Sequence, residues 1–184
     1  MAGLGDGDVF TTVLATAPQR AIWLAINLAT AILAASVIAF YQDTIEKVVA
    51  LAVLMPIVAS MGGIAGTQSL TVLIRAMAMG QINDRTEIWL VRREIFVSII
   101  NGLIWAFVIA VIAAYWFDDT TLGLIIAFAI IINLITAGIA GASLPLILDR
   151  LRIDPALAGG VVLTTITDVV GFFAFLGVAT YFYN

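Results

Sequence analysis

The sequence predicts an all-α integral membrane protein with five membrane-spanning helices. Hydrophobic residues make up 63% of the 184 positions and charged residues only 11%, which is far from the balance of a water-soluble domain. The mean hydropathy is +1.16. The polar residues also fall between long apolar runs, and five of these runs reach the roughly 20 residues needed to cross the bilayer core.

The five runs follow one another along most of the chain. Residues 1–20 are rich in Gly, Asp and Thr and lack the layout of a cleavable signal peptide, so we expect a soluble or interfacial lead-in there. The membrane domain then comprises residues 21–184. The predicted spans are residues 21–41, 48–79, 95–117, 121–148 and 156–183.

Local signals refine the ends of these spans. Residues 81–94 alternate acids and arginines with apolar residues, which predicts a short cytoplasmic or interfacial helix that extends the third span. Pro145 is expected to bend or end the fourth span, because proline removes a backbone hydrogen bond. Asp154 before Pro155 is typical of a helix start. Asp154 therefore serves as a cap, or its charge also gathers cations at the mouth of a pathway.

The basic residues predict the orientation. With a cytoplasmic N-terminus, all seven arginines fall on the cytoplasmic side and only Lys47 lies outside. Five crossings then leave the C-terminus outside. We therefore expect an N-in/C-out multi-pass protein of the cell (inner) membrane, with the lipid bilayer as its surroundings.

The missing residue types and the net charge exclude or disfavour several classes of function. The chain has neither cysteine nor histidine, so thiolate and imidazole metal sites and Ser/His or Cys/His catalytic pairs are ruled out. Its net charge of −4 disfavours nucleic acid as a partner. We expect no enzymatic activity, since no nucleophile and base pair is visible.

Asp168 is the most informative residue. It lies near the middle of the fifth span with no basic neighbour in sequence. A carboxylate at that depth costs several kcal/mol or more, so it normally faces a protein interior or a water-filled path. Helical spacing predicts which residues share its face. They are Thr164, Thr165, Val161 and Gly171.

Asp168 has three interpretations. It could be protonated and hydrogen-bonded, it could pair with an arginine from another span, or it could bind a cation. Cation binding is favoured because the arginines lie near the span ends. Thr164 and Thr165 either bond back to carbonyls of the preceding turn or expose an oxygen beside the carboxylate.

The second span contains an unusual run, GGIAGTQS at residues 62–69. Small residues let helices approach closely, which is one interpretation. The other is backbone exposure along a cavity, since irregular or carbonyl-exposing backbone at membrane depth survives only there. Gln68 is polar and should face protein. The candidates to line a pathway are therefore Gly63, Gly66 and Gln68 in this span and Gly160, Val161 and Gly171 in the fifth. Asn27, Asn101, Asn133 and Thr136 are expected to form hydrogen bonds between helices.

Together these motifs resemble those of the MgtE family of magnesium channels. Residues 56–80 are similar to the family's second helix, residues 154–172 to its fifth, and residues 20–24 (RAIWL) to the start of its first. The resemblance covers nearly the whole chain. It implies a homodimeric Mg²⁺ channel with its pore on the two-fold axis, lined by the second and fifth helices.

The resemblance also implies roles for single residues. Asp168 falls on the pore aspartate, which binds the ion together with its symmetry mate. Thr164 falls on a position whose backbone carbonyl lies near that ion, and Asp154 on an acidic position at the cytoplasmic mouth. Ile64 and Gly160 stand where Asn occurs in members of the family. Fewer side-chain ligands make Mn²⁺, Ca²⁺ or other divalent cations possible further cargo beside Mg²⁺.

The soluble N-terminal and CBS domains of many family members have no counterpart in these residues. If those domains supply Mg²⁺ feedback, flux through this chain should persist at high internal Mg²⁺.

Two functions other than a channel are also considered. One is a proton- or Na⁺-coupled secondary transporter with Asp168 as the coupling carboxylate and a broken second helix. The other is a non-transporting subunit whose Asp168 pairs with an arginine of a partner.

Overall fold

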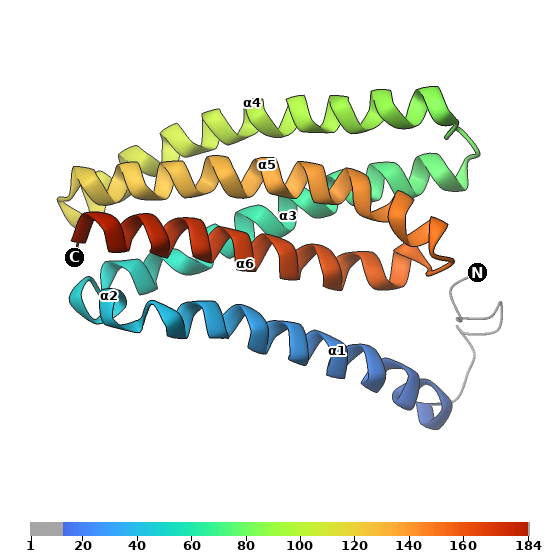
Figure 1. The fold of residues 1–184 in the computed structure, drawn as a ribbon, viewed down its shortest axis with the longest axis horizontal. Helices are drawn as coiled ribbons and strands as arrows, with labels where there is room; N and C mark the ends of the chain where they lie inside the picture. Colours follow the sequence, from blue (N-terminus) through green and yellow to red (C-terminus); the bar gives the residue numbers. More distant parts are fainter. Residues whose placement is uncertain (1–12, 184) are drawn as a thin grey trace.

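The computed structural model describes residues 13–183, which fold into α-helices without a strand (Figure 1). Five of the helices are long and apolar enough to cross a membrane, which confirms the predicted fold class. The sixth, α2, is a short connector. The helices are α1 (Val13–Phe40), α2 (Gln42–Lys47), α3 (Ala50–Ala78), α4 (Asp84–Phe117), α5 (Thr120–Arg150) and α6 (Pro155–Tyr183).

The two ends of the bundle differ in charge. The start of α1 and the α3–α4 and α5–α6 connections lie at one end, and α2, the α4–α5 connection and the C-terminus lie at the other (Figure 1). Arg75 and Arg150 stand in the last turns of α3 and α5, whereas Lys47 ends α2. We call the first the arginine-rich end and the second the opposite end. The asymmetry on which the orientation depends is thus a property of the folded bundle.

Several helix boundaries differ from the expected ones. α1 begins at Val13, inside the segment expected to lead in, and residues 1–12 of that segment lie outside the described residues. By contrast, α4 runs without a break from Asp84 to Phe117, which confirms the helix expected to extend the third span; only the first three residues of that segment precede it. Pro145 does not end the fourth span, because α5 continues to Arg150. A proline inside a membrane helix is tolerated where neighbouring helices pack around it, and Pro145 is buried.

The glycine-rich run does not break its helix. α3 is continuous from Ala50 to Ala78 and contains both Pro56 and residues 62–69. The backbone of this run is therefore regular, and its two interpretations, close helix packing and exposure along a cavity, apply to different glycines of the run. The broken second helix on which the coupled-transporter alternative relied is also absent.

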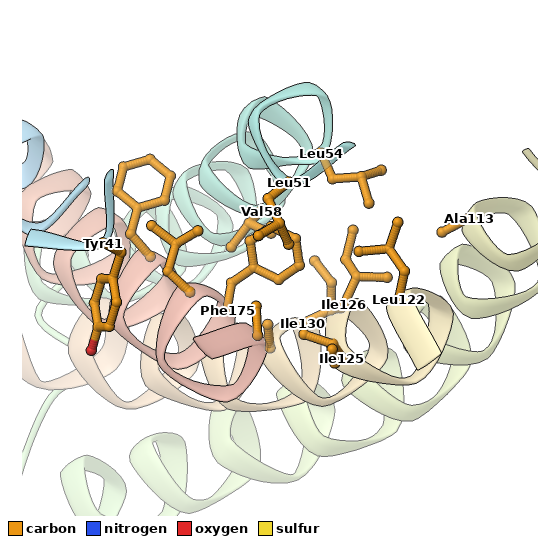
Figure 2. Packing of buried hydrophobic residues seen from close by; sticks show 14 of the residues in the cluster. Tyr41, Leu51, Leu54, Val58, Ala113, Leu122, Ile125, Ile126, Ile130 and Phe175 are labelled. Atoms are coloured by element: carbon orange, nitrogen blue, oxygen red, sulfur yellow. The ribbon is translucent and has the colours of Figure 1, made fainter. Parts of the chain in front are cut away.

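α5 is the central helix and packs against α3, α4 and α6. In the apolar stretch of α5, 56% of the residues are buried, compared with 6% in that of α1. The apolar side chains of α1 face outward, as expected for contact with lipid. Figure 2 shows the core near the opposite end, where Phe175 of α6 lies among side chains of α3 and α5. Leu54, Ile126 and Phe175 are fully buried there. This core holds α3 and α6 together on one side of α5.

Candidate ion-binding groove

A groove of about 980 Å³ follows the face where α3 and α6 meet. α6 contributes Asp168 and Thr164, and α3 supplies most of the remaining lining. Toward the arginine-rich end the lining includes Arg75 and Leu90. The groove thus connects the level of Asp168 to one end of the bundle.

Asp168 lies near the middle of α6. At a rise of 1.5 Å per residue it is roughly 20 Å from either end of that helix. Gly63 lies near the middle of α3, and a Cβ atom placed on it would lie 3.8 Å from Cγ2 of Thr164. The two helices run antiparallel, so their midpoints meet at this contact, one turn before Asp168.

The carboxylate of Asp168 has no partner within the described part of the chain. It is half-exposed toward the groove, and neither of the two ion pairs formed among those residues involves it. Among the side chains that the structure describes, no arginine reaches it, so the intrachain arginine pair weighed for Asp168 is not seen. No three acidic side chains of that described set gather into a metal cage. One chain therefore presents a single carboxylate at this depth.

The threonine hydroxyls bond back to their own helix. Thr164 donates to the carbonyl oxygens of Gly160 and Val161 at 3.0 and 3.1 Å, and Thr165 donates to that of Val161 at 2.7 Å. These bonds use the hydroxyl hydrogens and leave oxygen lone pairs free. Thr164 lines the groove, whereas Thr165 and Val161 lie half-buried outside its lining.

The candidate pathway glycines differ in their surroundings. Gly63 lines the groove together with the exposed Gln68. Gly160 is not part of the lining, and a Cβ on it would meet nothing within 4 Å. Gly66 and Gly171 are buried behind the lining. A Cβ on Gly66 would lie 2.7 Å from the Leu163 side chain, so its role is close packing.

Asp154 is separated from the others. Its Oδ1 accepts a hydrogen bond of 2.7 Å from the backbone N–H of Ala156, which confirms the predicted helix cap. It does not line the groove, and along α6 it lies roughly 20 Å from Asp168. The structure thus brings Asp168, Thr164, Gly63 and Gln68 together, but not Asp154.

A polar stripe on α3 was missed as part of the candidate site. Ser60, Thr67, Thr71 and Arg75 all line the groove. Thr67 and Thr71 donate to the carbonyls of Gly63 and Thr67, each at 2.7 Å. Their position could have been predicted from the sequence, because the four-residue spacing from Gly63 through Thr67 and Thr71 to Arg75 places these residues on one helix face.

The comparisons with known proteins decide the family. The model of the MgtE family, described as divalent cation transporters, matches residues 55–178. The chain belongs to the MgtE family. The matched region covers most of α3 and α6, and therefore nearly all of the groove.

Three MgtE relatives, each named magnesium transporter, align over 182 residues. The chain is 35% identical to the protein from Bacillus subtilis (strain 168), 32% to that from Thermus thermophilus and 29% to that from Enterococcus faecalis. The alignments cover 98%, 96% and 99% of this chain but 40% of each relative. The chain thus spans less than half the length of the MgtE proteins it matches.

Proposed function

We propose that this chain forms a pathway for divalent cations across the membrane, with Mg²⁺ as its cargo and Asp168 as the central ion site. The supporting observation is the unpaired carboxylate of Asp168, which faces a groove near the middle of α6, where this helix packs against the middle of α3. A charged carboxylate at this depth is costly without a counter-charge. A transported cation supplies it, and membership of a family of divalent cation transporters favours this choice.

We further propose that the pathway is a channel on the two-fold axis of a homodimer. The groove is open on one side, and one chain brings a single carboxylate to it. A second copy facing the first would close the groove and add a second Asp168. Two carboxylates would balance one divalent ion and could hold it through its water shell, since Mg²⁺ dehydrates reluctantly.

The donor atoms favour hard cations. The groove offers carboxylate, hydroxyl, amide and backbone oxygens, which suit Mg²⁺, Ca²⁺ and Mn²⁺ rather than soft metals. Thr164 lies one turn from Asp168 and lines the groove with it, so it supplies a hydroxyl and a carbonyl on the same face. Because Gly160 and Ile64 add no polar side chain, charge and pore width would set the selectivity, and Mn²⁺ or Ca²⁺ would compete.

The proposed orientation is N-in/C-out in the cell (inner) membrane, with the arginine-rich end in the cytoplasm. Coupled transport is the alternative mechanism. Uptake driven by a Mg²⁺ gradient alone, with no proton or Na⁺ gradient, would favour a channel over it.

The proposal is tested by Mg²⁺ uptake into proteoliposomes. Asp168→Asn and Asp168→Ala should each lower uptake by at least about tenfold, because neutralising a desolvated ion site removes well over 1.4 kcal/mol of binding. Asp43→Asn is the matched control, since Asp43 is exposed on α2 at the opposite end. Uptake and divalent competition that stay at wild-type levels in both Asp168 variants would overturn the assignment.

A further inference from the structure

The amide of Asn133 fills a slot between α3 and α6. Asn133 belongs to α5 and is completely buried. A Cβ atom on Gly62 of α3 would lie 2.4 Å from its Nδ2, and one on Gly171 of α6 would lie 2.6 Å from the same atom. Both separations are shorter than real Cβ contacts. The slot therefore exists only because both flanking helices carry glycine there.

Asn133 is also bonded to one of these helices. Its Nδ2 donates to the carbonyl oxygen of Val58 at 2.7 Å, which confirms the interhelical role expected for it. By contrast, Asn101 bonds to a carbonyl of its own helix. The Oδ1 of Asn133 is buried without a hydrogen-bond partner among the described residues. An unsatisfied buried oxygen is unfavourable, so packing alone would be better served by an apolar side chain.

The slot lies directly behind the groove. Gly62 precedes Gly63, whose exposed face meets Thr164 at the groove. Gly171 follows Asp168 by one helical turn. The same short segments of α3 and α6 thus carry the groove lining on one side and hold the amide on the other.

We infer that Asn133 is a positioning residue for the ion site, setting the spacing and register of α3 and α6 at the level of Asp168. This inference rests on the proposed function of Asp168. The amide acts as a spacer of fixed thickness, and its bond to Val58 fixes where α3 lies along it. A polar group of this kind specifies one packing arrangement at the expense of an unsatisfied atom. Ion binding at Asp168 then depends on a residue that never touches the ion.

The spacer is tested first by thermal unfolding of purified protein in detergent. Gly62→Ala should lower the midpoint clearly, because its Cβ collides with the amide. Asn133→Ala removes the amide, so Gly62→Ala in that background should cost much less, and the double variant should be more stable than Gly62→Ala alone. The loss of stability caused by Gly171→Ala should be relieved only in part by Asn133→Ala, because the added Cβ would also lie 3.0 Å from the Val58 side chain.

Gly102→Ala is the matched control. Gly102 lies on α4 away from the groove, and its Cβ would meet Ile131 and Leu134 at ordinary distances of 3.6 and 3.7 Å. Its midpoint should stay near that of the wild type in both backgrounds. Strictly additive losses for Gly62→Ala and Asn133→Ala would contradict the spacer.

The positioning role is tested by the Mg²⁺ dependence of uptake. Asn133→Ala should raise the half-saturating Mg²⁺ concentration by about three- to tenfold, because small misplacements of an ion site weaken binding strongly. A merely structural role would lower the maximal rate through loss of folded protein and leave half-saturation unchanged. That second outcome would overturn the inference.

The two proposals fail separately. Normal uptake by Asp168→Asn would refute the ion site itself, whatever Asn133 does. Loss of uptake in Asp168→Asn with unchanged half-saturation in Asn133→Ala would keep the ion site and refute only the positioning role.

Discussion

Two acids of helices long and apolar enough to cross a membrane have opposite surroundings. Glu94 of α4 is 6% exposed, its Oε2 accepts a hydrogen bond of 2.9 Å from Ser69 of α3, and its Oε1 lies 2.9 Å from Arg93. Asp168 faces a groove and has no such partner within the described residues. A neutralised, hydrogen-bonded acid is a structural element, whereas an unpaired one at a cavity is available to a ligand. Partners rather than depth separate the two roles.

The pair of Ser69 and Glu94 should contribute to stability. Ser69→Ala removes the donor from a buried carboxylate, so the free energy of unfolding should fall by about 1–3 kcal/mol. Ser36→Ala is the control, because the Ser36 hydroxyl bonds only to Ile32 of its own helix and is exposed. It should change stability by less than about 0.5 kcal/mol. Denaturant unfolding in mixed micelles measures both, and equal effects would contradict the assigned role of Ser69.

At the scale of helices, Asp119 joins two elements at the opposite end. Its Oδ1 caps α5 by accepting a hydrogen bond of 3.1 Å from the N–H of Leu122, and its Oδ2 accepts one from the Tyr183 hydroxyl at the end of α6. Burial by itself raises the pKa of Asp119. The bonds from Tyr183, Leu122 and Thr121 outweigh burial, so the pKa of Asp119 is lowered from its ordinary value.

This lowered pKa makes stability depend on acid. The charged form of Asp119 is favoured by folding, so its contribution is complete above the ordinary pKa of about 3.9 and is lost as the pH falls through the lower folded value. Tyr183→Phe removes one of the bonds that lower the pKa of Asp119, so it should reduce the loss of stability at low pH. Asp119→Asn should remove the contribution altogether. Thermal midpoints between pH 6 and pH 3 (roughly the window set by these values) test this, and identical profiles for the three proteins would contradict it.

The predictability of the helices depended on what hydropathy measures. Apolar composition alone placed the third span from Ile95, because it marks the membrane-crossing part of a helix rather than the whole helix. The alternation of charged and apolar residues before Ile95 was needed to predict the extension, which begins at Asp84. Pro145 looked like a stop signal, but packing of α5 among its neighbours overrides the local preference. Sequence periodicity showed helix faces well and could not show what packs against them.

The candidate site was predictable in the same uneven way. A single carboxylate in an apolar run pointed to Asp168, and helical spacing pointed to Thr164. Gly66 and Gly171 carried the same local signals but face neighbouring helices, which only the fold reveals. The slot of Asn133 depends on residues on three helices that are far apart in sequence, so no local pattern could predict it.

For the whole molecule, one chain leaves a large part of its apolar surface and one side of its groove uncovered. The exposed side chains of α1 and α4 suit contact with lipid, as expected for a membrane bundle. The face of α3 differs, because there apolar Ile64 and Val72 alternate with Thr67, Gln68 and Thr71 along the groove. A stripe that mixes polar and apolar side chains is poorly matched to hydrocarbon. A second copy of the chain would cover it and would bring the two Asp168 carboxylates toward one axis.

Cross-linking in membranes tests this arrangement. The chain contains no cysteine, so a single introduced thiol reports only its own position. Ile64→Cys places it on the groove face, where Ile64 is 59% exposed, and a flexible bismaleimide should convert most of the protein into a covalent dimer. Ile104→Cys is the matched control, because Ile104 is 53% exposed on α4 and does not line the groove. It should remain monomeric. Equal cross-linking at both positions would indicate random collision, and monomers from Ile64→Cys would remove the support for a pore between two copies, since the two groove faces would then not meet.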